Sequence, residues 1–177
     1  ERFGNRFSLA LCLEDTINDD HVEEAEQILI SSLSQIFIQH EQKPFYLPQI
    51  FIRVRNPQQI QRLTKALGQS IKIVTGFIVP KFSPDNAQSY IEQMILVNEL
   101  VAKKLYMMPI YESPSIIDLR NRIDILYLLR DSLARIEDLI LNIRVGGNDL
   151  CHMFGFRRHA NESIHSIRPV SDIFSDI

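Results

Sequence analysis

Short, nearly uninterrupted apolar runs alternate with longer amphipathic stretches along this chain. The first run, residues 8–14, is typical of a strand buried on both faces of a parallel sheet. From Asp20 to Ile36 apolar residues recur every three or four positions, which predicts a helix with Asp19 or Asp20 as its cap. Strand and helix patterns then alternate along the chain.

Four further strands are predicted over residues 50–55, 73–81, 105–112 and 139–145. The intervening helices are predicted over residues 57–67, about 84–103 and about 114–136, each beginning at a proline. A short helix is expected over 149–156, then a loop over 157–168 that leads into a last helix over 169–177. The alternation predicts about five βα units and a parallel sheet.

Side chains alternate across a strand, so each predicted strand has two faces. Aliphatic residues fill one face: Leu9, Leu11 and Leu13 in the first strand, Ile50, Ile52 and Val54 in the second, and Leu139, Leu141, Ile143 and Val145 in the fifth. The opposite faces are mixed, and they include Cys12, Glu14, Arg53, Arg55 and Arg144. If the aliphatic faces pack on helices, the mixed faces point into the interior of a barrel.

Each of the first four predicted strands ends in charged residues, and the loop after the fifth strand carries one. They are Glu14 and Asp15, Arg53 and Arg55, Lys81, Glu112, and Asp149 beyond the last strand. Because the carboxyl ends of parallel strands share one rim, these residues should converge in space. We expect the working site at this rim.

A closed eight-stranded barrel typically takes about 250 residues. The 177 residues here hold only about five βα units, so the fold is either an open α/β domain or a piece of a (β/α) barrel. No repeat, low-complexity tract or linker divides the chain, and we expect one domain over 1–177. Exposed strand edges would favour association, which predicts a homo-oligomer.

Composition and charge exclude some classes of binding partner. With 45% hydrophobic and 23% charged residues the chain is typical of a globular protein. Its net charge of −3 and lack of a basic run predict no nucleic-acid partner. Apolar stretches fall short of the roughly 20 residues of a membrane span, so none is expected. Two cysteines far apart in sequence, Cys12 and Cys151, favour a reduced, cytoplasmic setting.

Glu112 and Asp149 could form an incomplete oxygen shell. Such a shell suits Mg²⁺, which keeps waters and takes further ligands from an anionic substrate. The alternative is that Asp149 caps a helix and Glu112 is solvated. Gly146 and Gly147, just before Asp149, would let backbone N–H groups approach a ligand, although glycine pairs also serve turn geometry alone.

Arg53, Arg55 and Arg144 could bind a substrate carboxylate through their forked guanidinium groups. The alternative is an internal ion pair with Glu14 or Asp15, and both can hold in turn as substrate binds and leaves. Lys81 is either a Schiff-base amine or a cationic clamp, and we favour the clamp because a Schiff base requires a desolvated amine.

Five segments carry a family resemblance. They are residues 12–17 (CLEDTI), 51–57 (FIRVRNP), 76–81 (GFIVPK), 109–113 (PIYES) and 146–150 (GGNDL). In this order they resemble the strand-end motifs of the citrate lyase β-subunit-like (HpcH/HpaI aldolase) family. The resemblance is closer to the branch of TIM-barrel C–C bond lyases from bacterial tellurium-resistance and stress operons, in which residues 154–158 (FGFRR) also fit.

The resemblance implies a (β/α)8 barrel of which this chain lacks the first strand and the last ones. It implies Mg²⁺ on Glu112 and Asp149, and an arginine contact to a substrate carboxylate or acyl-CoA thioester. The wider family places arginine two residues before Asn-Pro, where this chain has Val54, so Arg53 and Arg55 are both candidates.

The chemistry implied is C–C bond cleavage of a small hydroxy or oxo acid, or of its acyl-CoA thioester, through a metal-stabilised enolate. Glu14 or Asp15 is our candidate for the base that takes the hydroxyl proton. The alternative is a non-catalytic binding or assembly protein of a stress-resistance system that keeps the barrel scaffold.

Overall fold

Five parallel strands form one sheet in the computed structural model, which describes residues 4–177. The strands lie in chain order, β1 (Ser8–Cys12), β2 (Gln49–Arg53), β3 (Val74–Val79), β4 (Tyr106–Tyr111) and β5 (Arg144–Val145). Each is parallel to the next, and the sheet curls into half of a barrel. The predicted incomplete parallel α/β barrel is confirmed.

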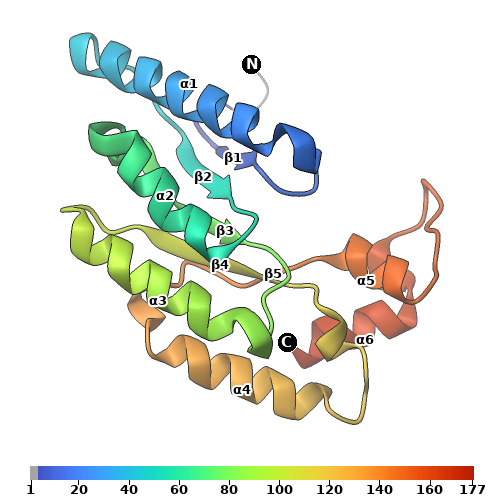
Figure 1. Cartoon of the computed structure of the whole chain (residues 1–177). Coiled ribbons are helices and arrows are strands. Elements are labelled where there is room, and N and C mark those ends of the chain that lie inside the picture. The colour runs from blue at the N-terminus through green and yellow to red at the C-terminus, as the bar shows by residue number, and fades with distance from the viewer. Residues whose placement is uncertain (1–3) are drawn as a thin grey trace.

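The first four helices connect successive strands, and the last two follow β5. They are α1 (Val22–Gln42), α2 (Pro57–Leu67), α3 (Pro84–Leu100), α4 (Arg122–Ala134), α5 (Gly147–Met153) and α6 (Arg168–Asp176). Short 3₁₀ turns cover Asp19–His21, Gly68–Ile73, Pro114–Ile116, Glu137–Leu139 and Ile164–Ser166. Figure 1 shows α1 to α4 side by side along one face of the sheet, with α5 and α6 beyond the carboxyl ends of the strands.

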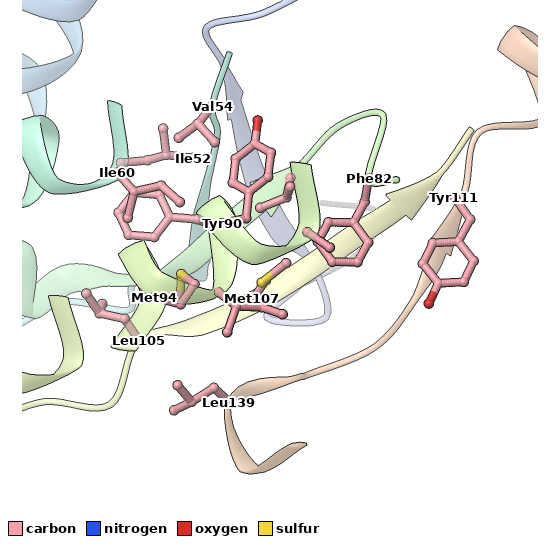
Figure 2. Close-up of a cluster of buried hydrophobic side chains, with 14 of the residues drawn as sticks. Ile52, Val54, Ile60, Phe82, Tyr90, Met94, Leu105, Met107, Tyr111 and Leu139 are labelled. Atoms are coloured by element: carbon pink, nitrogen blue, oxygen red, sulfur yellow. The ribbon is translucent and has the colours of Figure 1, made fainter. Parts of the chain in front are cut away.

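The hydrophobic core divides between the two faces of the sheet, as the alternation of side chains predicts. Ile52 and Val54 belong to the large cluster between sheet and helices, together with Met94 and Met107 (Figure 2). A second, smaller cluster lies on the opposite, interior face and consists of Phe51, Ile78, Met108 and Ile110. The interior face therefore has an apolar floor, and the charged residues stand at its carboxyl-terminal edge.

The structure corrects three element boundaries. The helix expected over 114–136 is interrupted, and α4 begins only at Arg122. Asp118 explains the interruption: its carboxylate accepts from the backbone N–H of Arg120 at 3.0 Å, a local bond that competes with helix formation. The expected cap, Asp19 or Asp20, is wrong: both lie in the 3₁₀ turn that Asn18 caps, and α1 begins at Val22 after His21, which makes no side-chain cap hydrogen bond.

The fifth strand is much shorter than expected. Residues 137–139 form a 3₁₀ turn, and only Arg144 and Val145 pair with β4, opposite Ile110 and Tyr111. A single bridge joins Met107 to Ile140 upstream. The aliphatic pattern over 139–145 therefore reflects a half-exposed edge rather than a full strand. Within residues 4–177 no helix is both long and apolar enough to cross a membrane.

Candidate functional site

Arg53 is the centre of a charged cluster at the carboxyl-terminal rim. Its Nη2 lies 2.6 Å from Glu14 Oε2, 2.8 Å from Asp15 Oδ2 and 3.4 Å from Glu112 Oε1. The parallel register causes this convergence, because Cys12 pairs with Arg53 and the chain after Cys12 crosses the end of β2. These contacts raise the pKa of Arg53 although its burial opposes the shift.

Lys81 closes the cluster from the end of β3. Its Nζ lies 2.6 Å from Glu14 Oε1 and 3.1 Å from Asp15 Oδ1. The hydrogen bond to Glu14 is the main reason that the pKa of Lys81 is raised, which opposes the neutral amine that a Schiff base requires. The geometry therefore favours a clamp over a nucleophile.

The backbone of Lys81 is also unusual. Its φ of 50° lies in the left-handed region, the single such value for a non-glycine residue within 4–177. This conformation aims the Lys81 N–H at Glu112 Oε1, 3.1 Å away, and Asn86 Nδ2 donates to the Lys81 carbonyl at 3.0 Å. Strained backbone held in place by neighbours is common at functional sites.

Glu112 and Asp15 differ in their tendency to ionise. Glu112 is 5% exposed, and burial raises its pKa, with the charge of Asp149 acting in the same direction. For Asp15 burial also acts upward, but hydrogen bonds and the charges of Lys81 and Arg53 prevail and lower its pKa. A cation beside Glu112 and Asp149 would stabilise the ionised form of Glu112.

The two glycines before Asp149 serve close packing. A Cβ on Gly146 would lie 1.9 Å from Glu112 Oε2, so only glycine lets the chain pass over this carboxylate. A Cβ on Gly147 would lie 2.2 Å from Cδ1 of Ile164. Gly146 therefore shapes the wall around Glu112, and Gly147 seats α5 on the turn at 164–166.

Arg55 lies apart from this cluster. Its guanidinium donates to the carbonyls of Leu13, Glu14 and Ile17 at 3.2, 3.1 and 2.6 Å, and it forms an ion pair with Asp19. It holds the loop that carries Glu14 and Asp15. Arg144 is exposed, and it lies opposite Ile110 in the pairing of β4 and β5. It makes none of the contacts of the Arg53 cluster.

The family of the chain follows from a comparison with protein-family models. Residues 2–177 match the family described as C–C bond lyase of the TIM-barrel fold. The chain belongs to this family. No curated protein matches it in a second comparison. Membership confirms the resemblance at the level of a TIM-barrel C–C lyase family and supports a function of the lyase or aldolase type.

In this C–C bond lyase family member an open cleft of about 820 Å³ adjoins the cluster. Its lining includes Lys81, Glu112 and Asp149 of the predicted site. It also includes residues that the strand-end rule did not single out, Ser83, Asp85, Ser113, Ser115 and His152. A signal for the serines is present in hindsight, since Ser83 and Ser113 each stand between a strand end and a proline.

The acidic side chains of this rim are its candidate metal ligands. Across the described part of the chain, no group of three or more His, Cys, Asp or Glu side chains is arranged to hold a metal ion. Glu112 and Asp149 both line the cleft, and two carboxylates could supply part of the oxygen shell that Mg²⁺ takes together with waters and substrate oxygens.

Proposed function

We propose that this chain carries most of the site of a Mg²⁺-dependent C–C bond lyase or aldolase that acts on a small hydroxy or oxo carboxylic acid, or on its acyl-CoA thioester. The observation that carries the proposal is the cluster around Arg53. Four carboxylates (Glu14, Asp15, Glu112 and Asp149) stand against two cationic side chains (Arg53 and Lys81). The formal surplus of two negative charges is what one divalent cation would balance.

Arg53 is our candidate for the substrate carboxylate. Arg55 donates to three backbone carbonyls, whereas Nε of Arg53 is buried without a hydrogen-bond partner among residues 4–177. The Arg53 side chain is 21% exposed at the rim, and a substrate carboxylate would form a charge-assisted pair with the accessible part of its guanidinium group. It would compete with Glu14 and Asp15 for Arg53, so substrate binding would loosen the ion pairs of the empty site.

Glu112 and Asp149 would hold Mg²⁺. The bound ion would supply positive charge to the substrate carbonyl oxygen, where negative charge develops as the C–C bond breaks. Gly146 keeps the Glu112 carboxylate in place, and the Lys81 N–H restrains its Oε1. Arg144, on the interior side of β5, stays a predicted contact for a longer substrate.

Glu14 is our candidate base for the hydroxyl proton. The pKa of Asp15 is lowered, which makes Asp15 a poor base, and we therefore propose Glu14. Glu14 is also the more buried of the two and touches both Arg53 and Lys81.

The finer assignment rests on the five strand-end motifs. They favour a citrate lyase β-subunit-like enzyme of a tellurium-resistance or stress system. From the two cysteines and the exposed strand edges we also retain the cytoplasmic setting and the homo-oligomer. We retain the prediction that residues 1–177 form one partial barrel without its first strand and last strands, residues 1–3 lying outside the described part. These additional strands would complete the wall of the cleft.

Mg²⁺ binding to the 177-residue chain tests the proposal, measured by calorimetric titration. Glu112→Gln and Asp149→Asn should each weaken binding about tenfold or more, because each removes one of two carboxylate ligands. The matched control is Glu24→Gln, an exposed carboxylate on α1. Unchanged affinity in both site variants would remove the metal from the proposal and favour a non-catalytic binding protein.

A further inference from the structure

The amino-terminal rim of the sheet carries a second hollow, opposite the charged cluster. It has a volume of about 620 Å³, within the range of small-molecule sites, and lies between the end of α2 and the end of α3. In Figure 1 this rim is at the left, at the tails of the strands. Three lysines line it, Lys65, Lys72 and Lys103.

Lys103 is held in a fixed position. Its Nζ donates to the carbonyls of Lys72 and Val74 at 2.8 and 2.6 Å, and its partial burial lowers the pKa of its ammonium group. Burial removes part of the hydration of this ammonium group. A bound anion would compensate for that loss by stabilising the charged form.

Within residues 4–177 the three lysines have no acidic partner. Among the described residues no carboxylate lies within 4.0 Å of Lys65, Lys72 or Lys103. The C-termini of α2 and α3 point to this rim and carry about half a negative charge each, which offsets only about one of the three positive charges. Glu41 lines an adjoining hollow of about 400 Å³ and could offset one more, so a positive surplus remains.

The rest of the hollow is apolar. Ile71, Val101 and Leu100 contribute to its lining, and Leu100 is 53% exposed. Lys72 separates the two hollows, and its Nζ lies 6.0 Å from the centre of the Phe37 ring on the far side. Cationic side chains beside an exposed aliphatic surface match a ligand with an anionic head and a short apolar tail.

We propose that this lysine hollow binds an amphipathic organic anion, with its carboxylate or phosphate on Lys65, Lys72 and Lys103 and its alkyl chain along Leu100 and Val101. The site is separate from the lyase cleft and goes beyond the proposed function. It does not require Mg²⁺ or the residues of the opposite rim.

Calorimetric titration of the full chain with three probes measures the contributions of the anionic group and of the alkyl chain separately. The probes are inorganic phosphate, hexyl phosphate and hexanoate. Hexyl phosphate should bind about tenfold more tightly than inorganic phosphate, which requires burial of only about two methylene groups. Hexanoate against hexyl phosphate then identifies the preferred head. Equal affinity of inorganic and hexyl phosphate would overturn the amphipathic ligand.

Charge-matched variants locate the site. Lys65→Gln combined with Lys72→Gln should weaken hexyl phosphate about tenfold. The control, Arg157→Gln combined with Arg168→Gln, removes the same charge from exposed positions elsewhere and should leave affinity within about twofold. Equal losses of affinity in both double variants would show that only net charge matters and would overturn the proposal. No loss of affinity in either variant would also overturn it.

Amide chemical shifts of the unaltered chain provide a measurement that does not depend on variants. Hexyl phosphate should perturb Gly68 and Ala102, which line the hollow, and leave Lys81 and Glu112 unchanged. Perturbations confined to the opposite rim would overturn the proposal. Tighter binding of a glutamate-rich peptide than of hexyl phosphate would also overturn it, in favour of a protein partner.

Discussion

The two rims of the sheet differ in how their cationic side chains are paired. At the carboxyl-terminal rim Arg53 and Lys81 are enclosed by carboxylates, and their ion pairs measure 2.6 to 3.4 Å. At the amino-terminal rim the Lys103 ammonium group donates only to backbone carbonyls among residues 4–177. In the first arrangement the cations are paired with carboxylates and can exchange partners, whereas the second retains an uncompensated positive charge. Catalysis is therefore expected at the first rim and simple anion binding at the second.

The largest expected effect is at Arg53. Arg53→Met leaves three carboxylates facing one another and should lower the free energy of unfolding by about 3 kcal/mol at pH 7. Asp15 has a lowered pKa in the folded state, so its contribution is present above its unfolded value of about 3.9 and is lost as pH falls through the folded value. The difference between the variant and the unaltered chain should therefore narrow toward pH 3.

Urea unfolding at pH 7 and pH 3 measures this effect. Arg168→Met is the control, because Arg168 is 89% exposed and should matter by less than about 0.5 kcal/mol. A loss for Arg53→Met that stays constant with pH would contradict the electrostatic origin.

Arg55 should show a smaller and more local effect. Arg55→Gln removes the donors to Leu13, Glu14 and Ile17 and should cost about 1–2 kcal/mol. Hydrogen exchange should accelerate at the amides of Ile17 and His21, whereas the amides of β3 keep their protection. Faster exchange spread evenly over the sheet would show that Arg55 is not specific to the loop.

Glu112→Gln should act in the opposite direction. Burial raises the pKa of Glu112, so ionisation destabilises the folded state as pH rises above the unfolded value of about 4.3. The variant should be more stable than the unaltered chain by up to about 1 kcal/mol at pH 7 and equal to it near pH 4. Chemical unfolding at both pH values tests this, and a variant less stable at pH 7 would contradict it.

The smallest effect is expected at the amino-terminal rim. The pKa of Lys103 is lowered by burial, so stability should rise as pH increases from the folded value toward the unfolded value of about 10.4. After solvent screening the gain between pH 8 and pH 10 is at most a few tenths of a kcal/mol. Lys103→Met should abolish it, and hexyl phosphate should reduce it by favouring the charged form.

Much of the fold could be predicted because it depends on local patterns. Apolar alternation placed Ile52 and Val54 on the helix side and Phe51 on the interior side, as observed. The break before α4 could not be predicted, because the amphipathic pattern continues across Asp118 while its side chain bonds to nearby backbone. The short β5 was missed because an exposed edge carries the same aliphatic residues as a buried strand.

The position of the site could be predicted, but the different roles of Arg53 and Arg55 could not. Strand parity places Arg53 and Arg55 on one face, but β2 ends at Arg53 and Asn56 already caps α2, with its Oδ1 3.0 Å from the Gln59 nitrogen. Alternation no longer applies at Arg55, which turns to the loop. The cradle at Gly146 was also hidden, since a glycine pair does not reveal which side chain it admits.

Oxalate binding tests the central claim most directly, namely that Arg53 and a metal on Glu112 and Asp149 act on one small acid. Oxalate is planar and anionic like an enolate, and its affinity can be measured by calorimetry with and without Mg²⁺. We predict that Mg²⁺ tightens oxalate at least about tenfold and that Arg53→Lys, which keeps the charge but loses the fork, removes most of this gain. Oxalate affinity that is independent of Mg²⁺, or unchanged in Arg53→Lys, would contradict the account.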